Sequence, residues 1–161
     1  MATRRAELKP GLFLLYDEQD ESHFQSRKWH AMRSGRTWYA AHKPWKSARV
    51  FFHNLVMPPT DGLMVDHINR DGLDCRRENL RLVTKAQNIR NRRINKNNTS
   101  GFKGVTKVSR NRWRAQIRVD GVDYRGRLWP DPEMAAREYD LMSRAYHGQY
   151  GATNEQLVGG E

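Results

Sequence analysis

The strictest constraint on the fold is a stretch in which apolar and polar residues alternate, 112–128. A pattern typical of a helix follows it directly. The apolar members of the alternating stretch predict one buried sheet face, and its polar members predict one open face. An Asp-Gly pair at 120–121 predicts a tight turn between two strands. The apolar members are Trp113, Ala115, Ile117, Val119, Tyr124, Gly126 and Leu128, and the polar members are Arg112, Arg114, Gln116, Arg118, Asp123, Arg125 and Arg127.

The helix that follows has defined ends. Asp131 can cap its N-terminus, Pro132 suits the first helical position, and Gly148 suits the residue after the last turn. One apolar stripe recurs along it at helical spacing and requires a cover, which the apolar sheet face can supply. The stripe consists of Ala135, Tyr139, Met142 and Tyr146. We therefore predict a three-stranded antiparallel sheet packed on one helix over residues 101–154, with a tail over 155–161.

Residues 1–93 precede this unit and predict a first domain, so that the whole chain belongs to the α+β class. Short apolar runs predict a buried strand at 12–16, and capping residues predict a helix around 21–28. Aromatic and small residues that flank a Ser-Gly pair predict a hairpin after it. The next apolar segment starts as a strand and can continue into a helix.

The last third of this domain, about 62–93, has the most regular pattern. It predicts a strand at 63–68, a long polar loop at 69–79, a strand at 80–83 and a helix from about 85 to 93. Thr84 and Gln87 have the spacing of a capping box at the start of that helix. The asparagine-rich segment 94–100 predicts a linker, either a flexible tether or a spacer that contacts phosphates.

The charge of the chain is concentrated. The formal net charge is +11, and residues 67–118 carry 15 of the 29 lysines and arginines but 3 of the 18 acids. Such a local excess predicts a polyanionic partner, either nucleic acid or an anionic membrane. No apolar run approaches the roughly 20 residues that span a bilayer, so a membrane is disfavoured. The single cysteine, Cys75, excludes an intrachain disulfide framework and a multi-cysteine zinc site, and fits a reducing cytoplasm.

The stretch "VDHINRDGLDCRRENLRLVTKAQN" contains residues suited to phosphodiester hydrolysis. Asp66 and Asn88 offer oxygen ligands, which suit Mg²⁺ or Mn²⁺ better than zinc. His67 starts on the opposite strand face from Asp66 and can accept a proton from water at neutral pH. Asn79 can bond backbone groups and hold the loop shut. Taken singly, such residues are more often found in a surface turn, a cap and a solvated helix position than in a catalytic site.

Their joint spacing resembles a known family. "VDHIN", "ENLRLVT" and "QN" resemble the HNH endonucleases, whose ββα-metal motif is a hairpin followed by a helix. The final histidine of that motif is replaced by Asn88, which is similar to the His-Asn-Asn variant of phage homing endonucleases. The resemblance covers about residues 8–93. It implies that Asp66 and Asn88 bind one divalent cation, that His67 activates water, and that Asn79 fixes the loop presenting His67.

The resemblance also implies a phage-encoded protein acting in the cytoplasm of a bacterial host, with 5′-phosphate and 3′-hydroxyl products. Cys75 is a departure, because the family pattern leads us to expect asparagine there. We expect it to affect only the packing of the loop, or else to be an exposed thiol.

The second unit resembles the DNA-binding domain of plant ethylene-response factors, of the APETALA-two type. "GFKGV", "WRAQIR" and "EMAAREYD" stand where that family has its Gly-Val, second strand and helix. The resemblance implies that the sheet enters the major groove of duplex DNA. Gln116 replaces an acid of that family and Arg125 replaces a tryptophan, so sequence preference does not carry over. A solvated sheet face is the alternative.

Together these patterns predict a metal-dependent DNA endonuclease of the homing type, with a tethered DNA reader. A monomer would nick one strand and a homodimer could cut both; no protein partner is indicated. The rivals are a DNA-binding regulator with an inactive nuclease fold and an RNA-binding module. The residues expected to contact DNA are Arg76, Arg77, Arg90, Arg93, Arg112, Arg114, Gln116, Arg118, Arg125 and Arg127.

Overall fold

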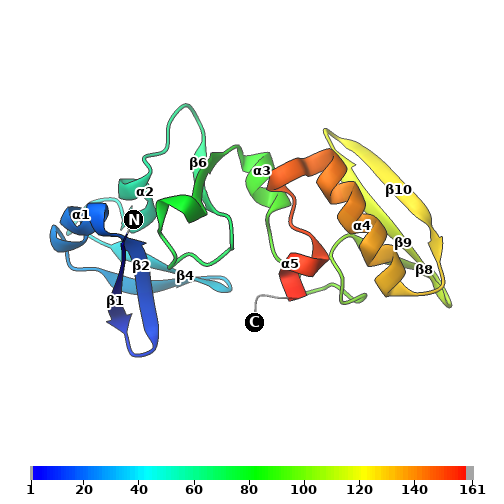
Figure 1. Cartoon of the computed structure of the whole chain (residues 1–161), viewed down its shortest axis with the longest axis horizontal. Helices are drawn as coiled ribbons and strands as arrows, with labels where there is room; N and C mark the ends of the chain where they lie inside the picture. The colour runs from blue at the N-terminus through cyan, green and yellow to red at the C-terminus, as the bar shows by residue number, and fades with distance from the viewer. Residues whose placement is uncertain (1, 159–161) are drawn as a thin grey trace. The chain divides into compact units, whose positions relative to one another are not determined.

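The computed structural model describes residues 2–158 and divides into two compact units, one up to Lys85 and one from Ala86. Figure 1 shows the mixed composition of the chain, with small antiparallel sheets and few helices. Within the described residues, none of the helices is both long enough and apolar enough to cross a bilayer.

The first unit contains two small sheets besides the hairpin of the candidate site. Strands β1 (Thr3–Lys9) and β2 (Leu12–Asp17) pair antiparallel, and β3 (His30–Ser34), β4 (Thr37–His42) and β5 (Val50–Phe51) form a three-stranded antiparallel sheet. The helices are α1 (Glu21–Gln25) and α2 (Phe52–Val56). The predicted strand, hairpin and strand-to-helix transition are thus confirmed. Strand β1 was not predicted; most of its residues are charged and exposed, although Ala6 and Leu8 alternate with polar neighbours.

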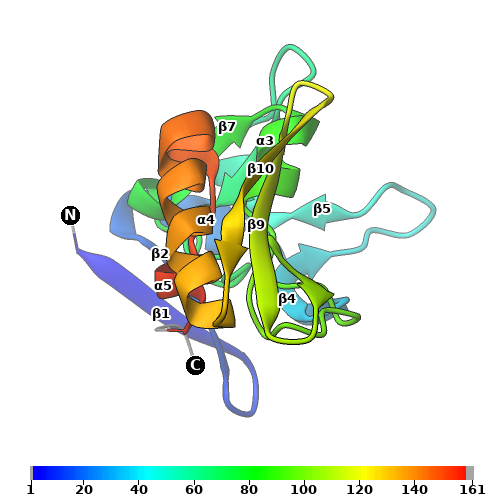
Figure 2. The same ribbon diagram turned by 90° about the vertical axis from the view of Figure 1, so that its right-hand side faces the viewer.

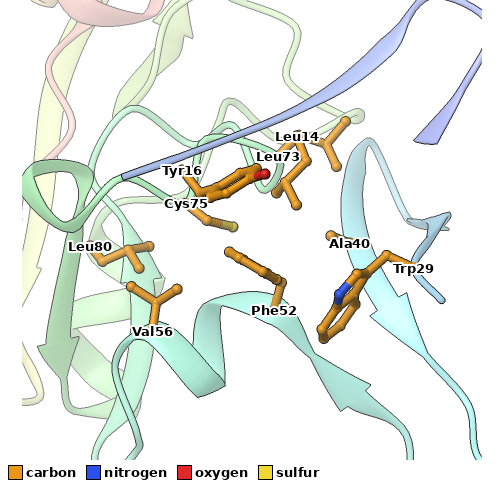
Figure 3. Close-up of a cluster of buried hydrophobic side chains, with 9 residues drawn as sticks. All are labelled: Leu14, Tyr16, Trp29, Ala40, Phe52, Val56, Leu73, Cys75 and Leu80. Atoms are coloured by element: carbon orange, nitrogen blue, oxygen red, sulfur yellow. The ribbon is translucent and has the colours of Figure 1, made fainter. Parts of the chain in front are cut away.

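The core of this unit includes part of the long loop. Figure 3 shows Leu73 and Cys75 among the buried side chains of the sheets and of α2. Leu15 of β2 donates its backbone N–H to the carbonyl of Leu73 (2.9 Å) and accepts from the N–H of Cys75 (2.8 Å). Cys75 is fully buried in this core, so the alternative of an exposed thiol is wrong.

The second unit contains a three-stranded antiparallel sheet in the order β10-β9-β8 and a long helix against it (Figures 1 and 2). The elements are β8 (Val105–Ser109), β9 (Arg112–Val119), β10 (Val122–Trp129), α4 (Pro132–His147) and α5 (Asn154–Val158). Asp131 caps α4 by accepting the N–H of Glu133 at 2.6 Å, and Gly148 follows the helix with φ of 53°. Both ends of α4 therefore lie where the sequence predicts.

The apolar faces of sheet and helix meet in two clusters. One is built from Val105, Ala135 and Ala136, and the other from Ala115, Ile117 and Tyr139. Burying apolar area of this kind supplies about 25 cal/mol per Å², which is what holds a small sheet to a single helix. Tyr146 is the exposed end of the predicted stripe, and its ring stacks on Tyr124 at 4.7 Å between centroids.

One detail of the predicted alternation is wrong. A bulge lies between Arg125 and Leu128 in β10, so that Leu128 pairs with Arg114 and Trp129 pairs with Trp113. An extra residue in one strand reverses which side chains face the core beyond it. Leu128 is therefore exposed on the outer face, and Trp129 packs inward in its place.

The segments flanking the sheet are bonded within the second unit. Asn98, in the predicted linker, donates to the carbonyl of Phe102 at 2.8 Å, and Lys103 donates to the carbonyls of Arg90 and Arg92. Of the predicted tail, residues 155–158 lie in α5, where the buried Asp140 of α4 accepts the N–H of Asn154 at 2.7 Å. Residues 159–161 lie outside the described residues.

Candidate functional site

A two-stranded hairpin carries the central residues of the predicted site. Its strands are β6 (Met64–His67) and β7 (Leu80–Val83), which pair antiparallel with Asp66 opposite Arg81 and His67 opposite Leu80. Because neighbouring strand residues point to opposite faces, Asp66 and His67 have different surroundings. The two strands lie where the sequence predicts them, with the first shorter by one residue at each end.

Asp66 forms an ion pair inside the hairpin. Its Oδ2 accepts from Arg81 Nε at 3.0 Å and from Nη2 at 2.8 Å, and both side chains are largely buried. A carboxylate held by a planar guanidinium keeps a fixed orientation. Arg81 was not among the residues predicted for the site. Cross-strand pairing would have found it, because the hairpin register places it directly opposite Asp66.

His67 lies against side chains from other parts of the first unit. The centre of its ring is 5.9 Å from that of Tyr39 and 4.9 Å from that of His53. Its Nε2 is 3.8 Å from the sulfur of Cys75. Burial lowers the pKa of His67 and outweighs the opposite effect of nearby acids. The imidazole is thus neutral at pH 7 and carries a lone pair that can accept a proton.

Tyr39 and His53 carry no local signal in the sequence. They come from β4 and α2, and only the packing of the first unit brings them to His67. Burial also lowers the pKa of His53, to about 3, so this second imidazole is uncharged as well. His67 is therefore enclosed by uncharged rings on the side of the hairpin that faces the core.

Asn79 is buried and bonds the loop to itself. Its Oδ1 accepts the N–H of Asn69 at 3.0 Å, while its Nδ2 donates to the carbonyl of Asp74 at 2.7 Å and to Oδ1 of Asn69 at 3.0 Å. The N–H of Ile68, next to His67, donates to the carbonyl of Asn79 at 2.8 Å. These bonds close the loop directly after the strand that carries His67.

Asn88 lies in helix α3 (Lys85–Arg90), which is three residues shorter than predicted. The helix ends early because the N–H of Arg92 bonds the carbonyl of Ile89, three residues back, and so closes a tighter turn. The boundary between the two units falls at the start of α3, with Asp66 in the first unit and Asn88 in the second. Their joint binding of a cation stays a prediction.

The two arginines of the loop are engaged in ion pairs. Arg76 contacts both carboxylate oxygens of Asp74 at 2.8 and 2.7 Å, and Arg77 contacts those of the buried Asp20 at 3.0 and 2.6 Å. Burial alone would raise the pKa of Asp74, but the bonds from Arg76 lower it below its ordinary value. Both arginines thus brace the loop, and their contact with DNA stays a prediction.

The second unit presents most of the other predicted DNA contacts. The register places Arg114, Gln116, Arg118 and Arg125 on the sheet face opposite α4. Arg112 and Arg93 are exposed, Arg90 pairs with Asp120 at 3.2 Å, and the guanidinium carbon of Arg127 lies 4.5 Å from the centre of the Trp129 ring. Gln116 and Arg118 line a polar cavity of about 350 Å³ together with Asn95, Asn98, Thr106 and Asp123.

Comparison with known proteins identifies the hairpin. A family model for HNH endonucleases matches residues 58–90, which include β6, the loop, β7 and α3. The chain is 33% identical over 94 residues to Protein 3.8 of Escherichia phage T7, which covers 58% of this chain and 77% of the phage protein. It is 34% identical over 108 residues to the uncharacterized HNH endonuclease L560 of Acanthamoeba polyphaga mimivirus, which covers 65% of this chain.

The hairpin and these matches define a nuclease domain. The chain belongs to the HNH endonuclease family, as the sequence resemblance implies. It spans 55% of the length of the mimivirus relative. No solved structure gives a significant match.

Proposed function

We propose that the protein is a metal-dependent endonuclease that hydrolyses phosphodiester bonds in duplex DNA, of the homing type found in phages. The observation that carries the proposal is the neutral His67, fixed at the end of β6 beside a loop that Asn79 closes. A buried neutral imidazole can take a proton from an attacking water, which is the general-base step of hydrolysis.

The donor set at Asp66 and Asn88 fits a hard cation. A carboxylate and a carboxamide oxygen are ligands of the kind that Mg²⁺ and Mn²⁺ accept, with waters and substrate completing the shell. When bound, such an ion supplies positive charge to the phosphate oxygens as they become more negative. Arg81 holds one oxygen of Asp66 and so orients the carboxylate for this role.

A plasmid-nicking assay tests the proposal. The full chain with Mg²⁺ should convert supercoiled plasmid to the nicked form, and EDTA should stop the reaction. Because general-base catalysis contributes about 10²–10⁴-fold, His67→Ala should slow nicking by that factor. The substitution Asn88→Ala should raise the Mg²⁺ concentration needed for half-maximal rate. Equal and negligible conversion in every lane would favour a DNA-binding regulator with an inactive nuclease fold.

The outer sheet face of the second unit favours a role in reading DNA. Three arginines and a glutamine share that face, and arginine pairs bidentately with guanine as glutamine does with adenine. We propose that this face binds the duplex near the cleavage site, as the resemblance to ethylene-response-factor domains implies. Competition between duplex DNA and structured RNA at one salt concentration tests it, since a clear preference for RNA would overturn this assignment.

The number of strands cut follows from the number of sites. One chain carries one hairpin with one His67, so a monomer is expected to nick, and a homodimer on DNA is needed to break both strands. Ends with 5′-phosphate and 3′-hydroxyl groups would be ligatable. Ligase treatment of the nicked product therefore distinguishes this chemistry from one that leaves 3′-phosphate.

A further inference from the structure

Three side chains with metal-binding atoms converge inside the first unit. One ligand atom each from His53, His67 and Cys75 lies within 4.8 Å of the other two. All three residues are at least nine-tenths buried. The Nδ1 atom of His53 is buried and has no hydrogen-bond partner in the structure. An orphaned ring nitrogen in an apolar core is costly, so an ion bound through Nδ1 of His53 would remove a penalty.

One pair of ligand atoms already has nearly the spacing of a tetrahedral site. Zinc bonds of about 2.0–2.1 Å to nitrogen and about 2.3 Å to sulfur imply ligand atoms roughly 3.3–3.6 Å apart. The Nε2 of His67 and the sulfur of Cys75 are 3.8 Å apart, so this pair needs to close by only a few tenths of an ångström. His53 approaches from α2, and its ligand atom lies within 4.8 Å of those of His67 and Cys75.

We propose that His53, His67 and Cys75 bind one zinc-class ion, with a fourth position for water. A thiolate and two imidazoles are the ligands that such a borderline-soft ion prefers over Mg²⁺. This site is therefore chemically distinct from the oxygen set at Asp66 and Asn88. On binding, the S–H bond of Cys75 breaks, the sulfur–metal bond forms, and the proton passes to solvent.

An ion bound at His53, His67 and Cys75 would inhibit the nuclease, an inference that rests on the proposed function. A neutral imidazole has one nitrogen with a lone pair, and the other nitrogen carries hydrogen. If the lone pair of His67 binds the ion through Nε2, the ring has no position left to accept a proton from water. The same histidine thus serves either as base or as ligand, and Cys75 makes the second state accessible.

A Co²⁺ titration of the full chain without DNA tests the site independently of cleavage. Because Cys75 is the single cysteine of the sequence, any thiolate-to-cobalt absorption band must arise from it. We expect a band that saturates at one ion per chain, with visible bands of tetrahedral cobalt. Zinc should displace the cobalt, and calorimetry in two buffers should show one proton released. No thiolate band in the wild-type protein would overturn the proposal.

Two variants define the ligands. Cys75→Ser should abolish the band, and His53→Gln should weaken Co²⁺ binding by more than the roughly 10- to 100-fold that follows loss of a second-shell partner. Circular dichroism melting shows whether each variant is folded. If the substitution of the buried Cys75 prevents folding, the Co²⁺ affinity of His53→Gln alone tests the ligand set. Unchanged affinity in folded His53→Gln would refute a three-residue site.

Zinc inhibition of nicking tests the consequence. With Mg²⁺ in excess, equimolar Zn²⁺ should suppress nicking by the wild-type protein. For folded His53→Gln, the ratio of the nicking rates with and without Zn²⁺ should lie closer to one than for the wild type, whatever the basal rate of the variant. If the wild-type protein binds Co²⁺ through the thiolate but never nicks DNA, the proposed function fails and the metal site stands. If it nicks DNA equally with and without Zn²⁺, the site does not control the base.

Discussion

Removing the side chain of Asn79 should open the loop that follows β6. Asn79→Ala deletes the acceptor for the N–H of Asn69 and the donor to the buried carbonyl of Asp74. A buried group left without its partner costs about 1–3 kcal/mol. The N–H of Asn69 lies near the surface and can bond water instead, so its loss costs less. The expected destabilisation of the loop is about 2–4 kcal/mol.

Hydrogen exchange measured by mass spectrometry reports this opening directly. A change of about 2–4 kcal/mol corresponds to a roughly 30- to 700-fold faster exchange of amides in the loop, 68–79. Nicking should fall as well, because His67 precedes the loop. The variant Asn79→Asp keeps the acceptor for Asn69 but sets a carboxylate oxygen against the carbonyl of Asp74 and Oδ1 of Asn69, so its exchange should be at least as fast as that of alanine.

Gln19→Ala is the matched control, since it removes an exposed amide side chain from the same unit. Exposed substitutions of this kind usually change stability by less than about 0.5 kcal/mol. Loop exchange in Asn79→Ala that equals the Gln19→Ala value would show that the three bonds of Asn79 do not hold the loop. In that case the loop would not hold His67 in a prearranged position.

Three further predictions concern the second unit. Gly104→Ala should destabilise it by about 2–4 kcal/mol in urea denaturation, because φ is +68° and the new methyl carbon would lie 2.0 Å from the ring of Tyr139. Burial lowers the pKa of His147, so at acidic pH the unfolded chain binds a proton that the folded chain excludes. The melting temperature should therefore fall as the pH drops below about 6.5. This fall should be smaller in the variant His147→Gln. Arg118→Ala should leave stability nearly unchanged, since its pair with Asp123 is exposed, and should weaken DNA binding in a salt titration; unchanged affinity would contradict its assignment to the DNA-binding face.

Local patterns predicted the elements of the second unit well. Period-two alternation, an Asp-Gly turn and a helix with a capping aspartate are signals carried by neighbouring residues, and each depends on local backbone geometry. The bulge in β10 escaped prediction because it depends on how two strands pair rather than on the residues of one. It exchanged Leu128 for Trp129 on the inner face.

The candidate site shows the same division. The sequence by itself determined that Asp66 and His67 face opposite ways on one strand, because strand geometry dictates it, and it determined the family through the spacing of short motifs. It carried no local signal for Tyr39 or His53.

Tertiary structure decided the surroundings of those residues. Strand pairing brought Arg81 to Asp66, and packing of α2 and the loop into one core brought His53 and Cys75 to His67. Contacts between residues distant in the sequence depend on how separate elements fill a shared interior, and no local pattern encodes that. The sequence thus determined the residues available for chemistry, and the packed core determined which of them touch.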